Sequence, residues 1–92
     1  MIKNISVNEL KDIKNLIDIR SAEKYNNGHI PNAKNIPFNI LSIRYSDILN
    51  KNETYYIYCQ RGVQSLKLCQ ILSKNGYDVV NVVGGYESWL LK

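Results

Sequence analysis

The residue in this sequence best suited to chemistry is Cys59, which directly follows the aromatic and apolar run "TYYIY" (54–58). A thiolate is a strong nucleophile, so a cysteine at the end of a strand and close to a glycine is a candidate for covalent catalysis. Cys59 could equally be a small apolar residue that packs at the end of that strand. The segment alone leaves both interpretations open.

The residues after Cys59 predict a loop that would favour its thiolate form. Few residues separate the predicted strand from a helix that begins at position 62 or 63, so the turn would point backbone N–H groups toward the sulfur. Gly62 permits the backbone angles that such a turn needs. The helix adds a partial positive N-terminus, Arg61 adds a full charge, and Gln64 and Ser65 add side-chain donors. These groups together would lower the pKa of the Cys59 thiol from its ordinary value of about 8.5.

The elements that must position this loop alternate between strands and helices. Ser6 and Glu9 form a capping box that predicts a helix start. Gly28 marks a turn, and apolar spacing and turn residues mark the other boundaries. The predicted strands cover residues 2–6, 15–20, 33–36, 54–58 and 77–83. The predicted helices cover residues 7–13, 21–25, 38–49, 62 or 63 to 75, and 86–92.

This alternation through short loops predicts an α/β fold. The central sheet should be mostly parallel, with about five strands and with helices on both faces. Functional sites in such sheets lie beyond the carboxyl ends of the strands, which is the position of Cys59. A chain of 92 residues is expected to form one domain, 1–92.

The composition argues against several classes of function. The net charge of +4 comes from scattered residues without a basic block, so no nucleic-acid partner is expected. No run reaches the ~20 apolar residues of a membrane span, and the N-terminus lacks a secretory signal. One histidine and two cysteines ten positions apart make no zinc site, so we expect no metal and no cofactor. Two cysteines make no disulfide framework, which favours the reducing cytoplasm.

Four segments, in order, resemble motifs of the rhodanese family. They are "LIDIR" (16–20), "GHIPNAKNIP" (28–37), "YCQRGVQS" (58–65) and "VVGGYESW" (82–89). The third is similar to the family's active loop Cys-x-x-Gly-x-x-Ser, and the fourth to its Gly-Gly-x-x-x-Trp closure. Because the resemblance covers nearly the whole chain, it implies a single rhodanese-like domain.

The resemblance implies sulfurtransferase chemistry with Cys59 as the nucleophile. The Cys59 thiolate would take the outer sulfur of an anionic donor such as thiosulfate, or of another persulfide donor, and form a persulfide. Cyanide, or a protein or low-molecular-weight thiol, would then accept the sulfur. The resemblance also implies substrate contacts from the loop residues Gln60, Arg61, Gly62, Val63, Gln64 and Ser65.

One position departs from the family pattern. Many single-domain members carry arginine where this chain has Gln64, so Arg61 is the single charge on the loop. Arg61 is therefore the expected contact for a dianionic donor. The choice between thiosulfate and a persulfide-carrying partner stays open.

Several other residues are expected to be structural. Asp18 and Arg20 form a pair at the end of a strand, where Asp18 would hold neighbouring loop backbone. The resemblance implies that His29 lies in a structural turn rather than acting as a base. Cys69 lies on the apolar face of the long helix, roughly 9 Å along it from the loop at ~1.5 Å per residue, so no internal disulfide is expected. A redox role for Cys69 stays open. Tyr58 and Tyr86 are candidates for lining the wall of the site.

Two other classes of function could be expected of a cysteine loop on this fold. A rhodanese-like binding or regulatory module would leave its cysteine unused, and the intact Cys59 argues against it. A phosphatase or arsenate reductase would need an arginine six positions after the cysteine to clamp an oxyanion. Ser65 occupies that position, so the spacing excludes this chemistry.

Overall fold

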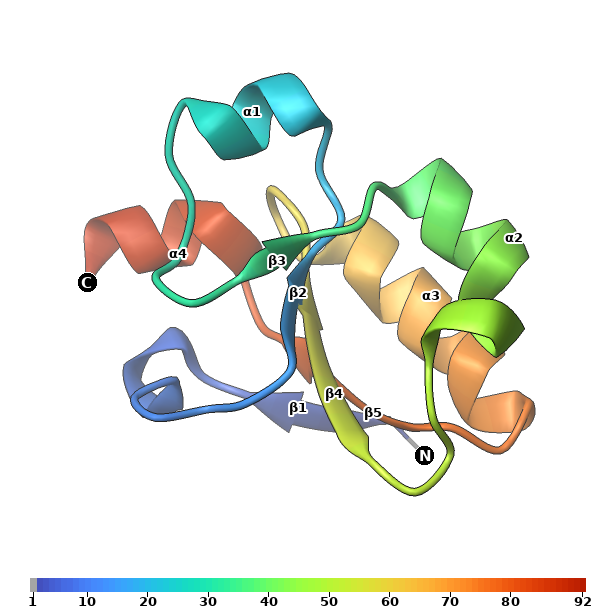
Figure 1. Cartoon of the computed structure of the whole chain (residues 1–92). Helices are drawn as coiled ribbons and strands as arrows, with labels where there is room; N and C mark the ends of the chain where they lie inside the picture. Colours follow the sequence, from blue (N-terminus) through green and yellow to red (C-terminus); the bar gives the residue numbers. More distant parts are fainter. Residues whose placement is uncertain (1) are drawn as a thin grey trace.

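The computed structural model describes residues 2–92, and its strands form one parallel sheet (Figure 1). Met1, the first residue of the predicted domain, lies outside the described residues. The strands are β1 (Lys3–Ile5), β2 (Leu16–Asp18), β3 (Lys34–Asn35), β4 (Thr54–Tyr58) and β5 (Asp78–Val82). The helices are α1 (Ala22–Asn26), α2 (Phe38–Ile48), α3 (Val63–Lys74) and α4 (Gly85–Leu91). The prediction of a five-stranded parallel α/β fold is confirmed.

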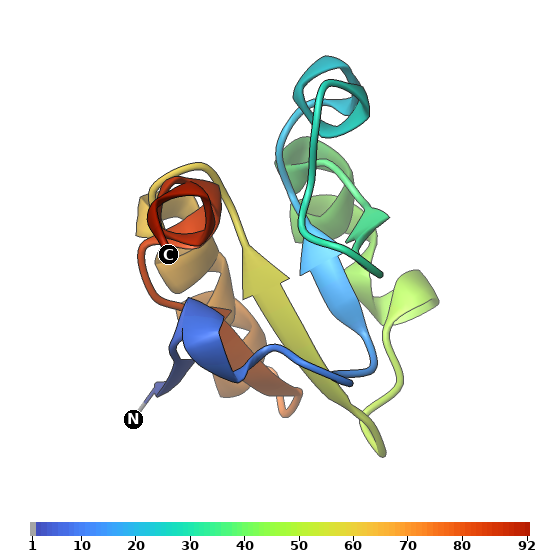
Figure 2. The same ribbon diagram turned by 90° about the vertical axis from the view of Figure 1, so that its left-hand side faces the viewer.

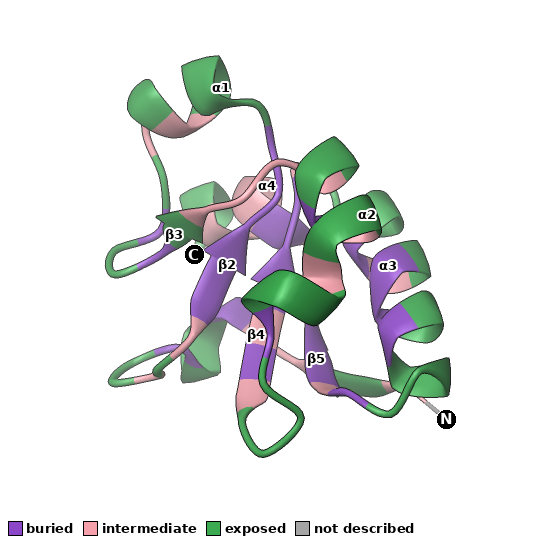
Figure 3. Cartoon of the chain, turned by 45° about the vertical axis from the view of Figure 1, so that its right-hand side comes forward, coloured by how far each residue is buried: buried purple, intermediate pink, exposed green. Residues whose placement is uncertain are grey.

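The helices cover both faces of the sheet because successive strand residues point to opposite sides. Ile17 and Ile57 belong to the apolar cluster under α2 and α3, which includes Leu68 of α3. Their neighbours Leu16 and Tyr58 belong to a second cluster, on the side of α4. Figure 2 brings this second side to the front. The central strands are buried on both faces, as Figure 3 shows for β2 and β4.

The strand order β1-β5-β4-β2-β3 places β4 in the middle of the sheet. Ile57 pairs with Ile17 of β2 on one side and with Asn81 of β5 on the other. The carboxyl end of β4, which leads into Cys59, therefore lies between two neighbouring strand ends. No helix within residues 2–92 is long and apolar enough to span a bilayer.

The helix predicted over residues 7–13 is wrong. The segment forms only a 3-10 turn, η1 (Val7–Glu9). Ser6 Oγ accepts from the backbone N–H of Asn8 at 3.1 Å, while the N–H of Glu9 donates to the Ser6 carbonyl at 3.0 Å. Asp12 then adopts a left-handed φ of 62°, which a continuing helix does not allow. Val7 is buried nonetheless and belongs to the apolar cluster on the side of α4.

Candidate active site

The Cys59 loop joins the end of β4 to the start of α3 within four residues, 59–62. Gly62 has a φ of 94°, in the left-handed region that a side chain rarely tolerates. Its conformation turns the chain sharply into α3, so the first amides of the helix lie beneath the cysteine. This is the turn that the sequence predicted.

The Cys59 sulfur lies in a cradle of hydrogen-bond donors. The backbone N–H of Gly62 donates to Sγ at 3.1 Å, and that of Ser65 does so at 3.4 Å. The thiol in turn donates to Ser65 Oγ at 3.4 Å. Cys59 is only 4% exposed, so these bonds form largely out of water. Such a cradle at a helix N-terminus can stabilise negative charge on sulfur.

Helix α4 holds the loop in this orientation from the other side. The N–H of Tyr86 donates to the Cys59 carbonyl at 2.9 Å, and that of Glu87 donates to the Gln60 carbonyl at 3.0 Å. The N–H groups of Tyr86 and Glu87 lie in the first turn of α4, where a helix offers them no acceptor of its own. The two loop carbonyls therefore act as their hydrogen-bond acceptors. Gly85 allows this approach, since a Cβ there would lie 2.2 Å from the Cys59 oxygen.

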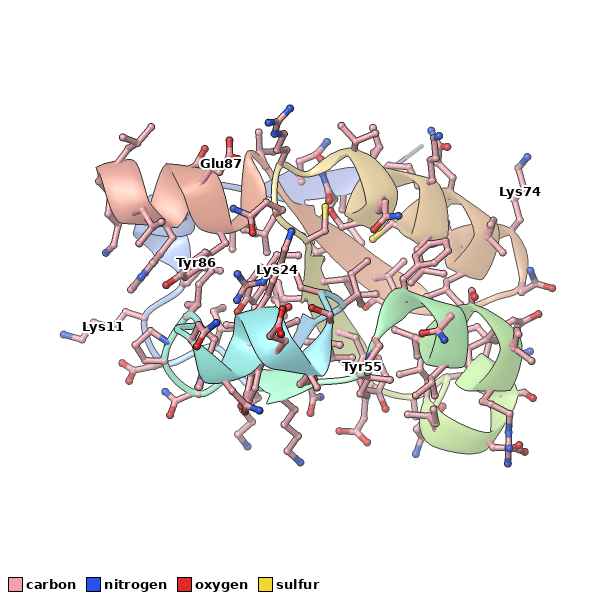
Figure 4. All side chains as sticks on the ribbon, turned by 90° about the horizontal axis from the view of Figure 1, so that it is seen from above. Lys11, Lys24, Tyr55, Lys74, Tyr86 and Glu87 are labelled. Carbon is pink, nitrogen blue, oxygen red and sulfur yellow. The ribbon has the colours of Figure 1, made fainter. Side chains whose placement is uncertain are left out.

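A pocket of about 690 Å³ opens above the sulfur, between the loop, α1 and α4. Its charged lining residues are Arg20, Lys24, Arg61 and Glu87. In Figure 4 the Lys24 side chain extends from α1 toward α4, where Tyr86 and Glu87 lie. Arg20 is paired with Asp18 and Arg61 with Glu87, so Lys24 leaves the pocket with a net positive charge, which suits an anion.

Arg20 and the predicted site residues of the loop divide into two groups. Those that line the pocket are Arg20, Cys59, Gln60, Arg61, Val63 and Gln64. Gly62 and Ser65 are buried and contact the sulfur from below. Arg61 is 77% exposed in its side chain, and its Nε donates to Glu87 at 3.2 Å. The single charge on the loop is therefore already paired with α4.

Asp18 and Arg20 form a buried ion pair beside the loop. Arg20 Nη2 donates to Asp18 Oδ2 at 2.8 Å and to the Gly28 carbonyl at 2.7 Å, and its Nη1 donates to Gln60 Oε1 at 3.2 Å. Burial disfavours the charged guanidinium, yet the hydrogen bonds and charge of Asp18 outweigh burial and raise the pKa of Arg20. Arg20 thus connects β2, the turn after α1 and the Cys59 loop.

Tyr58 does not form part of the site wall. It is fully buried, its hydroxyl donates to Asp18 Oδ2 at 2.7 Å, and it accepts from the N–H of Ile30 at 3.0 Å. Burial and the Asp18 hydrogen bond raise the pKa of the Tyr58 phenol. Tyr86, by contrast, lines the pocket, and its ring lies 4.1 Å from the Arg20 guanidinium carbon.

His29 lies away from the pocket lining, in the turn that follows α1. Its ring stacks on Tyr25 at a centroid distance of 3.8 Å, and its Nδ1 lies 2.9 Å from the Tyr25 carbonyl oxygen. The ring is exposed and is not hydrogen-bonded to Cys59. A structural role in the turn fits these contacts better than a role as a base.

Cys69 is expected to resist alkylation in the folded protein. It is fully buried, and burial, with a smaller contribution from Cys59, raises the pKa of its thiol to about 12. The thiol is therefore protonated at every pH below that value, and it has no access to reagent. Iodoacetamide at pH 8 should label Cys59 alone, whereas the denatured chain should be labelled twice. Peptide mapping that finds the label on native Cys69 would contradict this assignment.

Sequence reasoning missed three residues at or near the site, namely Lys24, Glu87 and Asn81. Lys24 lies in a helix that follows β2, the neighbour of β4, so correct strand order would have placed it near the loop. Glu87 lies within the segment taken only as a closure motif. Asn81 interrupts the apolar run "VVNVV" (79–83), and a polar residue in a doubly buried strand is a recognisable signal.

The sequence and the structure of this chain are similar to those of known proteins. The family model described as "Rhodanese-like domain" matches residues 4–92. YqhL of Bacillus subtilis, an uncharacterized protein, is 39% identical over 75 residues, covering 80% of this chain and 59% of YqhL. The chain thus spans less than two thirds of that relative's length. The thiosulfate sulfurtransferase PspE of Escherichia coli is 39% identical over 70 residues, covering 75% of this chain and 67% of PspE.

A solved structure shares the fold over almost the whole chain. The rhodanese-like domain protein from Staphylococcus aureus superposes with a TM-score of 0.83 and 40% sequence identity. The match covers 96% of this chain and 91% of that one. By sequence and by structure, the chain belongs to the family of rhodanese-like domains.

Proposed function

We propose that this chain is a sulfurtransferase that carries sulfur as a persulfide on Cys59. The observation that supports the proposal most is the position of the Cys59 sulfur, which accepts two backbone N–H groups at the bottom of a cationic pocket. This arrangement suits a nucleophile that alternates between a thiolate and a persulfide anion. The name of the relative PspE supports the same chemistry.

In the first half-reaction, the Cys59 thiolate attacks the outer sulfur of a donor such as thiosulfate. A bond forms between Sγ and that sulfur while the donor's own sulfur–sulfur bond breaks, and its electron pair leaves with sulfite. The protein is left as a persulfide, whose terminal sulfur carries the negative charge. The N–H groups of Gly62 and Ser65 would stabilise this charge, as an oxyanion hole does for oxygen.

In the second half-reaction, a nucleophilic acceptor takes the outer sulfur. Cyanide attacks that sulfur, the persulfide bond breaks, and its electron pair returns to Sγ as the Cys59 thiolate, with thiocyanate as the product. A thiolate acceptor would leave as a new persulfide in the same way. No external oxidant or reductant is needed. Both cysteines are free thiols, which fits the reducing cytoplasm that we propose as the location.

Lys24 and Arg61 are the two exposed cations that we propose to hold an anionic donor. Both line the pocket, but Arg61 is paired with Glu87, whereas Lys24 makes no ion pair within residues 2–92. Lys24 would thus supply charge that a loop with Gln64 lacks. Glu87 would oppose the binding of a dianion, because it both repels the ligand and occupies Arg61.

Lys24→Met and Arg61→Ala are each expected to raise the KM for thiosulfate by about threefold to tenfold, with a smaller change in kcat. Glu87→Gln should lower KM, because it releases Arg61 and removes a repulsive charge. Lys67→Met, on the exposed side of α3 and outside the pocket, is the matched control and should leave KM unchanged. An unchanged KM in both Lys24→Met and Arg61→Ala would remove these residues from donor binding.

Steady-state kinetics test the proposed function. Thiocyanate formation measured at several concentrations of thiosulfate and cyanide should give the parallel reciprocal plots of a ping-pong reaction. Absence of turnover with thiosulfate and with low-molecular-weight persulfides would instead favour a binding or regulatory module. Turnover by a persulfide alone would identify the donor class without changing the role of Cys59.

A further inference from the structure

Asn81 connects the catalytic cysteine to the edge of the sheet through hydrogen bonds. It lies on β5 and is 4% exposed, with apolar residues on both sides of it in the strand. Ser65 Oγ lies 2.6 Å from Asn81 Oδ1, and Asn81 Nδ2 donates to Asn4 Oδ1 at 3.1 Å. With the 3.4 Å contact between Cys59 Sγ and Ser65 Oγ, the four side chains form one chain of hydrogen bonds.

The direction of these bonds matches a neutral thiol. A carboxamide oxygen can only accept, so Ser65 must donate its one proton to Asn81. Ser65 then turns a lone pair toward sulfur and accepts from the Cys59 thiol. This arrangement would oppose a thiolate, because a hydroxyl lone pair would face a negative sulfur. The two backbone N–H groups donate to the sulfur in either state, but they do not change the direction in which the Ser65 hydroxyl points.

We propose that Asn81 is a positioning residue that reverses this chain of hydrogen bonds when Cys59 ionises. The Cys59 proton leaves to solvent through the pocket, and Ser65 keeps its own proton but turns it toward the thiolate. Asn81 rotates its carboxamide so that Nδ2 donates to Ser65 Oγ and Oδ1 accepts from Asn4. Asn4 can follow because it is exposed. Asn4 gives up its 3.4 Å bond to the Ile2 carbonyl, while the side chains of Ser65 and Asn81 keep hydrogen-bond partners in both states.

The inference rests on the proposed use of Cys59 as a nucleophile, but it concerns how the protein supports the thiolate. The titratable or charged groups that face Cys59 from the surrounding elements are Arg20, Lys24, Arg61, Cys69, Tyr86 and Glu87. None of these side chains is hydrogen-bonded to Ser65 or Asn81. Asn81 therefore acts on the sulfur through Ser65, by a route separate from the pocket charges.

A pH titration of the native protein by NMR tests the reversal directly. The side-chain amide signals of Asn81 and Asn4 should move together, with the midpoint of the thiolate ultraviolet absorbance. Cys59→Ser should abolish the movement, and Ser65→Ala should abolish most of it, because the connection to sulfur is then broken. The Asn35 amide, which donates to the Asp18 and Arg20 carbonyls, is the internal control and should not move. Asn81 signals that stay fixed, or that move equally in Ser65→Ala, would overturn the proposal.

A substitution gives an independent readout. Asn81→Asp can only accept from Ser65, so it should raise the midpoint pH of Cys59 alkylation by about one unit or more. In a Ser65→Ala background the same substitution acts only through space, and its effect should fall to roughly half or less. Equal shifts in both backgrounds would contradict the proposal. Since neither readout requires sulfur transfer, failure of the reversal is distinguishable from failure of the proposed function.

Discussion

Cys59→Ser is expected to abolish sulfur transfer, lowering turnover on the order of a thousandfold or more. Serine keeps the shape of the site, and its hydroxyl can still accept from the N–H groups of Gly62 and Ser65. An alcohol is not ionised at neutral pH, however, and an oxygen cannot carry a sulfane sulfur reversibly. Thiocyanate formation from thiosulfate and cyanide is the measurement.

Cys69→Ala is the matched control for this experiment. Cys69 is fully buried in the core between the sheet and α3, and the proposed reaction does not use it. The variant should keep its turnover while losing some stability from the cavity that it creates. Turnover that survives in Cys59→Ser but falls in Cys69→Ala would show that the wrong thiol has been assigned to the reaction.

Gly85→Ala is expected to disable the site without touching a reacting group. The added Cβ would lie 2.2 Å from the Cys59 oxygen, so α4 and the loop must separate. Separation breaks the bonds from the N–H groups of Tyr86 and Glu87 to the loop carbonyls. The loop N–H groups would then no longer be held against the sulfur. We expect a loss of about 1–3 kcal/mol in the free energy of unfolding, together with most of the transfer activity.

Gly76→Ala separates the effect on the loop from the effect of backbone strain. Gly76 also has a left-handed φ, of 90°, but it follows α3, and its neighbours are side-chain atoms of Lys51 at 3.4 Å and beyond. Its substitution should cost about 1 kcal/mol in unfolding free energy while the folded protein keeps its turnover. Chemical denaturation and thiocyanate assays on both variants make the comparison. Near-native turnover in Gly85→Ala would contradict the proposed part of α4 in holding the loop.

The sheet and the place of Cys59 in it could be predicted from the sequence because both follow from local patterns. An apolar strand such as 54–58, a glycine that turns the chain and a helix with an apolar face are each visible within a dozen residues. Short crossovers between such elements leave a parallel sheet as the natural arrangement. The cradle of N–H groups around the sulfur follows from that short turn.

The features that could not be predicted depend on contacts between distant segments. The pairing of Arg61 with Glu87 joins residues 26 positions apart, and it gives a partner to the charge that the loop was expected to offer to a ligand alone. Tyr58 was expected in the site wall, but the alternation of β4 points it to Asp18 on the opposite side of the sheet from Ile57. The prediction of a helix over 7–13 was wrong because it rested on a capping signal at the first residues of the segment. That signal does not indicate the left-handed conformation of Asp12, which ends any helix there.

Mass spectrometry of the protein after incubation with thiosulfate tests whether Cys59 carries the transferred sulfur. Intact protein should gain the mass of one sulfur atom, and peptide mapping without reductant should place it on the peptide that contains Cys59. Addition of cyanide should remove the sulfur and release an equal amount of thiocyanate. A protein that gains no sulfur from thiosulfate or from a persulfide donor, or that carries the sulfur on Cys69, would contradict the account.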